Sequence, residues 1–117
     1  MDDDAGVVQV TTDLLTRYGF RVGSAMDGDT AIAAYQEAQE SGDPYKVVIL
    51  DLVIPVGKGG LEVIAILKKI DPEVKAIVSS GYADDQAMID FADYGFMGAC
   101  AKPYHFKEMK ALLDRLI

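Results

Sequence analysis

The sequence has few of the residues that build a disulfide, a hydrolytic triad or a zinc site. Among its 117 residues there is one cysteine, Cys100, and one histidine, His105. A single cysteine excludes an internal disulfide and suits a reducing cytoplasm, where we expect the protein to act. Cys100 lies in an apolar segment, so we expect a buried thiol rather than a nucleophile. A lone histidine excludes a zinc cluster, and we expect His105 on the surface.

Long apolar runs and basic residues are scarce as well. No stretch approaches the ~20 apolar residues of a membrane span, and no signal peptide is visible. Eleven Lys and Arg stand against 19 Asp and Glu, which gives a net charge of −8. This balance argues against direct nucleic-acid binding, because that needs a basic face. Half of the residues are hydrophobic, so we expect one folded domain over residues 1–117.

Helical and extended segments alternate along the chain. Breakers and apolar spacing predict helices over residues 4–18, 27–40, 60–70, 84–94 and 104–117, with Pro103 available to open the last one. Strands are predicted over residues 20–25, 46–51, 74–80 and 96–101. Such alternation favours a parallel sheet with helices on both faces.

Asp51 is the most informative residue of this pattern. It closes the apolar run 47–50 and opens a loop that contains Pro55, Gly57, Gly59 and Gly60. Open α/β sheets place their ligand sites at the carboxyl ends of strands, so Asp51 is a candidate nucleophile or metal ligand. An isolated Asp in this position more often caps the next turn. The residues at the other strand ends therefore decide whether Asp51 is a turn cap or part of a ligand site.

Polar residues also mark the other strand ends. Asp2 and Asp3 stand at the start of the chain, Ser80 ends the predicted strand 74–80, and Lys102 follows the last strand. Taken singly, these residues suit a solvated terminus and surface positions. Together, Asp2, Asp3 and Asp51 supply the hard oxygen ligands that Mg²⁺ prefers, and Lys102 and Ser80 can bind phosphoryl oxygens.

In this order and spacing the motifs resemble the receiver domain of two-component response regulators, in the style of receivers attached to hybrid sensor kinases. The resemblance runs from Met1 to Ile117, and the motifs that carry it are Asp2-Asp3, Asp51-Leu52-Val53-Ile54-Pro55, Gly59-Gly60, Val78-Ser79-Ser80-Gly81-Tyr82 and Lys102-Pro103. It implies a flavodoxin-like (CheY-like) three-layer α/β/α fold with a parallel sheet of order 2-1-3-4-5. It also implies a phosphoacceptor, rather than an enzyme, that takes a phosphoryl group from the phosphohistidine of a histidine kinase or phosphotransfer protein and signals by a conformational change.

The resemblance assigns roles to particular residues. Asp51 would be the phosphoacceptor and Asp3 a direct ligand of Mg²⁺ or Mn²⁺. Asp2 would bind the metal through water, and the carbonyl of Val53 would also face it. The alternative is a receiver-like module that is not phosphorylated and serves only for protein interaction or dimerisation.

Further roles concern the switch. Ser80 would be the switch hydroxyl, and Lys102 would pair with the phosphate. Many receivers carry a mobile aromatic residue where this chain has Ala99, so the signal would travel through Ser80 and the loop after it. Tyr82 and Val53 would flank the approach of water to the phosphoryl group, and we expect slow loss of phosphate.

One departure from the family pattern concerns the start of the chain. Receivers begin with a strand before the acidic pair, whereas here only Met1 precedes Asp2. Without that central strand, its neighbours would lie about 10 Å apart. Segment 20–25 could then pair directly with 46–51, another chain could fill the gap, or the natural start could lie upstream. We expect a homodimer, either through this gap or through the face of the fourth helix, last strand and last helix, which would carry Met88, Phe91, Phe96 and Met109.

Overall fold

Three parallel strands form the centre of the fold, side by side in the order β1-β2-β3. The structure, a computed structural model, describes every residue from Met1 to Ile117. The strands are β1 (Val48–Asp51), β2 (Ala76–Ser80) and β3 (Gly98–Ala101). The helices are α1 (Ala5–Arg17), α2 (Gly28–Glu40), α3 (Gly60–Ile70), α4 (Gln86–Ile89), the 3₁₀ helix η1 (Phe91–Tyr94) and α5 (Phe106–Leu116). The predicted alternation of strands and helices and the parallel sheet are confirmed.

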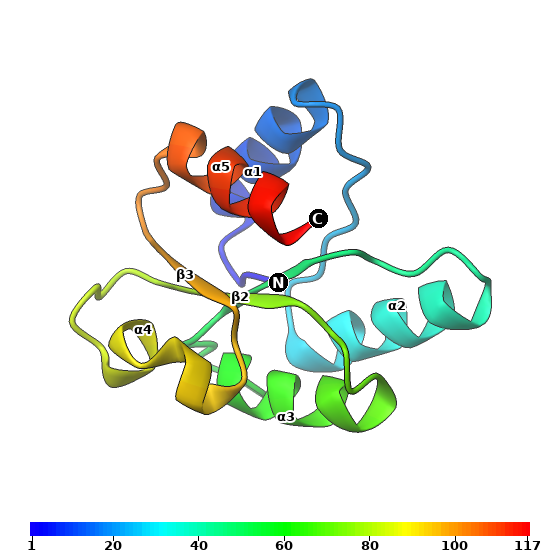
Figure 1. Cartoon of the computed structure of the whole chain (residues 1–117). Coiled ribbons are helices and arrows are strands. Elements are labelled where there is room, and N and C mark those ends of the chain that lie inside the picture. The colour runs from blue at the N-terminus through cyan, green and yellow to red at the C-terminus, as the bar shows by residue number, and fades with distance from the viewer.

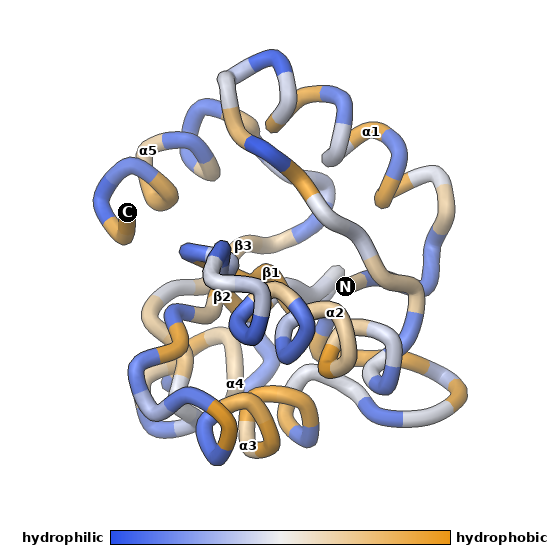
Figure 2. Tube along the Cα trace, turned by 90° about the vertical axis from the view of Figure 1, so that its right-hand side faces the viewer, coloured by the Kyte–Doolittle hydropathy of each residue, from blue (hydrophilic) through white to orange (hydrophobic).

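Helices cover both faces of the sheet. Figure 1 shows α1 and α5 together on one face and α2, α3 and α4 on the other. The same three layers are seen from the side in Figure 2, where polar and apolar segments alternate along each helix. Such alternation is expected of helices that bury one side and expose the other. None of these helices combines the length and the apolar composition that crossing a membrane requires.

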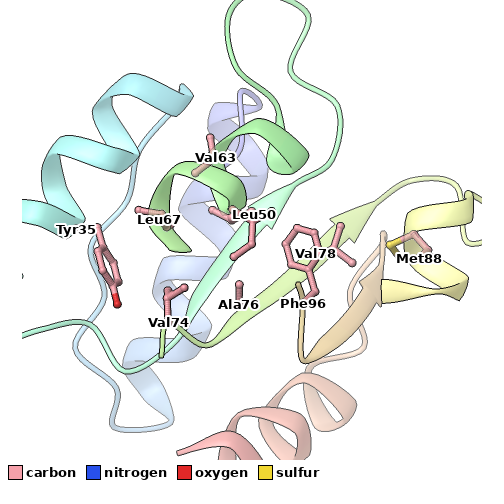
Figure 3. Packing of buried hydrophobic residues seen from close by; sticks show 10 residues of the cluster. Tyr35, Leu50, Val63, Leu67, Val74, Ala76, Val78, Met88 and Phe96 are labelled. Carbon is pink, nitrogen blue, oxygen red and sulfur yellow. The ribbon is translucent and has the colours of Figure 1, made fainter. Parts of the chain in front are cut away.

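Two hydrophobic cores lie on opposite faces of the central strand. All five residues of β2 are buried, and its three apolar residues alternate between the two cores, as the pleat of a strand requires. Ala76 and Val78 contribute to the core beneath α2, α3 and α4. Ile77 contributes to the other core, between the sheet and helices α1 and α5. Figure 3 shows Val63 and Leu67 of α3 beside Leu50 of β1 in the first core.

Aspartate side chains set the start of two helices. Asp4 accepts hydrogen bonds from the N–H groups of Gly6 and Val7 and so caps α1. Asp27 accepts the N–H of Thr30 at the start of α2. These bonds satisfy donors that have no partner inside the helix. The predicted bounds of these helices are confirmed to within one residue, and α3 has its predicted bounds.

The prediction of a strand over residues 20–25 is wrong. No strand forms there, and the segment does not pair with β1. Instead Met1 lies against β1, because its amino group donates to Ile49 O and its carbonyl accepts the N–H of Asp51. Asp2 in turn donates its N–H to Ala25 O at 3.1 Å. This is the one backbone bond between segment 20–25 and the residues before α1, and one bond does not make a pair of strands. The sheet is therefore not closed by direct pairing of segment 20–25 with β1.

The prediction of one helix over residues 84–94 is also wrong. The chain forms the single turn α4 and then η1, and Asp90 between them has φ −105° and ψ 43°, outside the helical region. The carbonyl of Asp90 then accepts the N–H of Asp93 at 3.0 Å, and this three-residue spacing is that of a 3₁₀ helix rather than of a continued α-helix.

Two predictions about the last helix and its surroundings need correction. Pro103 does not open α5, which begins at Phe106 after His105, because Tyr104 is held against the sheet by a hydrogen bond. Met88, Phe96 and Met109, three of the four residues predicted on the face of the fourth helix, last strand and last helix, are buried core residues and not part of an exposed face. His105 is exposed, as predicted, whereas Cys100 is only half-buried.

Candidate metal and phosphoryl site

Three aspartates meet at the carboxyl end of the sheet. Asp51 ends β1, and the N–H of Asp51 donates to Met1 O, which brings the start of the chain beside it. Asp2, Asp3 and Asp51 each offer a carboxylate oxygen, and these oxygens lie within 4.8 Å of one another. Asp2 and Asp51 are buried and Asp3 is exposed. The structure therefore brings together the three acids that the sequence predicted as metal ligands.

Lys102 supplies the positive charge of this site. Its Nζ lies 2.5 Å from Asp2 Oδ2 and 3.0 Å from Asp51 Oδ2. The backbone N–H of Lys102 donates to Ser80 O at 2.8 Å, which fixes the root of the side chain at the end of β2. One cation thus contacts two of the three predicted acids.

Burial and charge act against each other on these groups. Burial raises the pKa of Asp51 above its usual range, and the nearby charge of Asp2 adds to this, while Lys102 only partly opposes them. Burial alone would lower the pKa of Lys102, but its contacts with the carboxylates of Asp2 and Asp51 outweigh burial and raise that pKa. Asp51 is therefore easier to protonate than an ordinary aspartate, chiefly because burial disfavours its charged form.

The donor set fits a hard divalent cation. Asp2 Oδ2 is buried and accepts no hydrogen bond of good geometry, although the Lys102 ammonium lies close to it. Asp2 Oδ1 is already used by the N–H of Asp4 at 2.9 Å. Exposed Asp3 gives the cluster an open side toward solvent. Three carboxylates with one under-coordinated buried oxygen and an open side match the oxygen ligands and retained waters that Mg²⁺ prefers.

Two glycines let α3 begin directly against the Asp51 loop. A Cβ atom at Gly60 would lie 2.9 Å from the carbonyl oxygen of Asp51. At Gly59 it would lie 2.7 Å from the carbonyl oxygen of Leu52. These are contacts with backbone, which has little room to yield, so the Gly59-Gly60 pair keeps the loop after Asp51 folded against the helix.

The remaining predicted residues lie around this cluster. Ser80 is buried at the end of β2, and its hydroxyl accepts the N–H of Tyr82 at 3.1 Å. The N–H of Val53 lies 3.4 Å from Asp51 Oδ1. Val53 and Tyr82 are 55% and 69% exposed, and their role in limiting the approach of water stays a prediction.

One pair near the site was missed by the sequence reasoning. Ser79 Oγ lies 2.5 Å from the hydroxyl of Tyr104, two residues beyond Lys102. The available signal was strand alternation, which places Ser79 on the same face as Ile77 and therefore toward α5.

Comparison with known proteins identifies the family. The model of the response regulator receiver domain matches residues 1–114. The chain belongs to the response regulator receiver family. Receiver domains are phosphoacceptors of two-component signalling that interact with histidine kinases or phosphotransfer proteins, and this chain has their function.

Relatives of this receiver occur in bacteria and yeast. It is 26% identical to the chemotaxis protein CheY of Thermotoga maritima, over 99% of this chain and 92% of that protein. It is also 26% identical to the transcription factor SKN7 of Saccharomyces cerevisiae, over 100% of this chain but 18% of that protein. The receiver therefore spans about a fifth of the length of this transcription factor.

Solved structures confirm the flavodoxin-like, CheY-like fold. The chain superposes with a TM-score of 0.85 on a chain from the CheX-CheY-BeF3-Mg²⁺ complex of Borrelia burgdorferi, with 22% identity, 98% of this receiver covered and 84% of that chain. The predicted fold class is thus confirmed.

Proposed function

We propose that Asp51 is the residue that accepts the phosphoryl group from a phosphohistidine. The observation that carries this is the buried Asp51 carboxylate, 3.0 Å from the ammonium of Lys102 and next to two further acids. In the transfer, a carboxylate oxygen of Asp51 forms a bond to phosphorus. The bond from phosphorus to the histidine nitrogen breaks, and that nitrogen leaves with the electron pair. The donor is a histidine kinase or phosphotransfer protein in the cytoplasm.

Lys102 and a bound Mg²⁺ or Mn²⁺ would balance the charge of this step. Asp3 and Asp51 would hold the metal directly, Asp2 through water, and the carbonyl of Val53 would complete the protein ligands. When bound, the metal supplies positive charge that offsets the phosphoryl oxygens. Lys102 would exchange its contact with Asp51 Oδ2 for a phosphoryl oxygen, a charge-assisted bond of the same kind.

Ser80 would carry the signal away from the site. Its hydroxyl now accepts the N–H of Tyr82. A phosphoryl oxygen on Asp51 would draw the Ser80 hydroxyl as a donor, and loss of the bond to Tyr82 would release the loop before α4. Because Ala99 has no ring to move, this loop and α4 are the route by which the change would reach the surface.

Intact-protein mass spectrometry with a small-molecule phosphodonor and Mg²⁺ tests the acceptor. We expect one phosphoryl group on the native chain and none on Asp51→Asn. Asp93→Asn is the matched control, since Asp93 is an exposed aspartate in η1, outside the cluster. Equal labelling of Asp51→Asn and the native chain would contradict the assignment.

A second candidate function is interaction without phosphorylation, through a homodimer. An apolar groove of about 590 Å³ lies where α4, β3 and α5 meet, with Met88, Phe91, Ala99 and Leu112 in its lining. An apolar groove of this size on a surface can receive side chains of a second copy, and two-fold pairing is the commonest closed arrangement. The receiver would then serve as a docking or dimerising part of a larger signalling protein, such as a hybrid sensor kinase.

A further inference from the structure

Ser79 is the fourth of the five residues of β2 and follows three apolar residues. It is 0% exposed, and its hydroxyl has one partner, the hydroxyl of Tyr104 at 2.5 Å. A buried hydroxyl without a partner costs free energy, so this bond keeps both groups satisfied where water does not reach Ser79. An alanine or valine in β2 would avoid that cost. The Ser79 hydroxyl is therefore best explained by the residue that it holds in place, Tyr104.

Ser79 makes hydrogen bonds to both loops that flank the site, the one after Asp51 and the one after Lys102. In the sheet it stands opposite Asp51 on β1 and Cys100 on β3. Its carbonyl accepts the N–H of Leu52, the residue directly after Asp51, at 2.8 Å. Its hydroxyl reaches Tyr104, two residues after Lys102. One residue thus connects the acceptor loop to the loop that carries the cation.

The loop from Lys102 to Tyr104 has few other attachments. Lys102 is held by its N–H to Ser80 O, and Pro103 between the two is exposed. The ring of Tyr104 meets Phe106 edge-on, with ring centroids 6.1 Å apart. The bond from Tyr104 to Ser79 is therefore a second polar anchor of this loop on the sheet, beside the backbone bond of Lys102 to Ser80. A lysine side chain is long and flexible, so the position of its ammonium depends on how firmly its backbone is held.

We propose that Ser79 and Tyr104 form a clasp that positions Lys102 for the phosphoryl group on Asp51. Both are positioning residues, since neither contacts the acceptor carboxylate. The inference rests on the proposed role of Asp51 and adds to it the two residues that position the Lys102 ammonium. Small displacements of a catalytic group can cost about 100-fold in rate, so partial loosening of the loop is expected to slow phosphoryl uptake roughly tenfold.

The test compares Ser79→Ala, Tyr104→Phe and the double variant with the native chain. Each single variant leaves one hydroxyl without its partner, whereas the double variant removes both, a change that is close to neutral for stability. Tyr94→Phe is the matched control, because the Tyr94 hydroxyl makes no hydrogen bond and lies on η1. Should Ser79→Ala not fold, Tyr104→Phe and the double variant still decide the question.

Two readouts separate positioning from a purely structural role. In the double variant, we expect native stability toward urea but a maximal phosphorylation rate about tenfold lower, with an unchanged half-saturating donor concentration. In a Lys102→Ala background, the same double substitution should cause no further loss, because the clasp acts through Lys102.

Other outcomes would overturn the clasp. A double variant that is phosphorylated at the native rate, or one that loses the same factor with and without Lys102, shows that the pair serves only packing. A native chain that takes no phosphoryl group at all would remove the role of Asp51 and the clasp together. That result is distinct from failure of the clasp alone, in which the native chain is labelled.

Discussion

The ammonium of Lys102 lies 3.0 Å from Asp51 Oδ2 and joins the last strand to the first at the carboxyl end of the sheet. The same ammonium lies 2.5 Å from Asp2 Oδ2. The site therefore holds three acids, Asp2, Asp3 and Asp51, against the Lys102 ammonium and the nearby amino group of Met1, whose pKa is lowered by burial. This imbalance has consequences for stability, metal binding and phosphoryl transfer that can each be measured.

Replacing Asp51 with Asn should stabilise the protein at neutral pH. The pKa of Asp51 is raised on folding, chiefly by burial, so the unfolded chain loses this proton at a lower pH than the folded one. Between the two pKa values the folded state binds more protons, and stability falls as pH rises through that window. Asp51→Asn removes this loss, with a gain of about 1 kcal/mol at pH 7 and none near pH 2. Urea unfolding across pH measures it, and a variant less stable than the native chain at pH 7 would contradict the account.

Millimolar Mg²⁺ or Mn²⁺ should bind the three acids and stabilise the fold. A metal at ten times its dissociation constant would raise the free energy of unfolding by roughly 1.4 kcal/mol. Asp3→Ala should weaken this effect, because Asp3 is the exposed, predicted direct ligand, and Asp93→Ala should leave it unchanged. Thermal unfolding at a series of metal concentrations gives the affinity. Absence of any shift at millimolar metal would exclude the site.

Lys102→Ala should reduce phosphorylation more than it reduces folding. Without the ammonium, Asp2 and Asp51 lose their compensating charge, which we expect to cost about 1–3 kcal/mol in the absence of metal. Added Mg²⁺ should recover part of this loss, whereas phosphoryl uptake should stay more than tenfold slower. Lys107→Ala, which removes an exposed lysine without an ion pair, is the control. If Lys102→Ala lost most of its stability even with metal but its folded fraction were phosphorylated at the native rate, Lys102 would be a structural residue.

The groove between α4, β3 and α5 should be the contact of a homodimer. Ala111 lies in its lining and is exposed, so Ala111→Lys would place like charges near one another across a two-fold axis. We expect the native chain to dimerise with rising concentration in light scattering and the variant to need at least tenfold more protein. Ala92→Lys adds the same charge on η1, outside the lining, as a control. A native monomer at all concentrations would refute the dimer.

The sequence was sufficient for most of the fold because its signals are local. The caps Asp4 and Asp27 and the glycines before α3 place helix starts within a residue. Apolar runs locate β1, β2 and β3 to within two residues of their starts. Segment 20–25 has the composition of a strand, but a strand also needs a partner strand. Its backbone bonds only to the N–H of Asp2 and, through Phe20 N–H, to Leu15 O of α1. Composition alone carries no information about that partner.

The site was predictable in part for a similar reason. Acids and a lysine at strand ends must meet at one edge of a parallel sheet, so Asp51, Asp2 and Lys102 could be grouped without coordinates. The Ser79–Tyr104 bond could not, since it depends on the path of the loop after Lys102 as well as on strand alternation. The same holds for the burial of Phe96 and Met109, which follows from how η1 and α5 turn against the sheet.

The most direct test of the central claim is to map the phosphorylated residue. The native chain would be treated with a small phosphodonor and Mg²⁺, and the acyl phosphate reduced with borohydride, which converts an aspartyl phosphate to homoserine. Peptide mass spectrometry should then find homoserine at position 51 and unmodified aspartate at positions 2 and 3. Homoserine at either of those two positions, or at none of the three, would contradict the assignment of Asp51 as the acceptor.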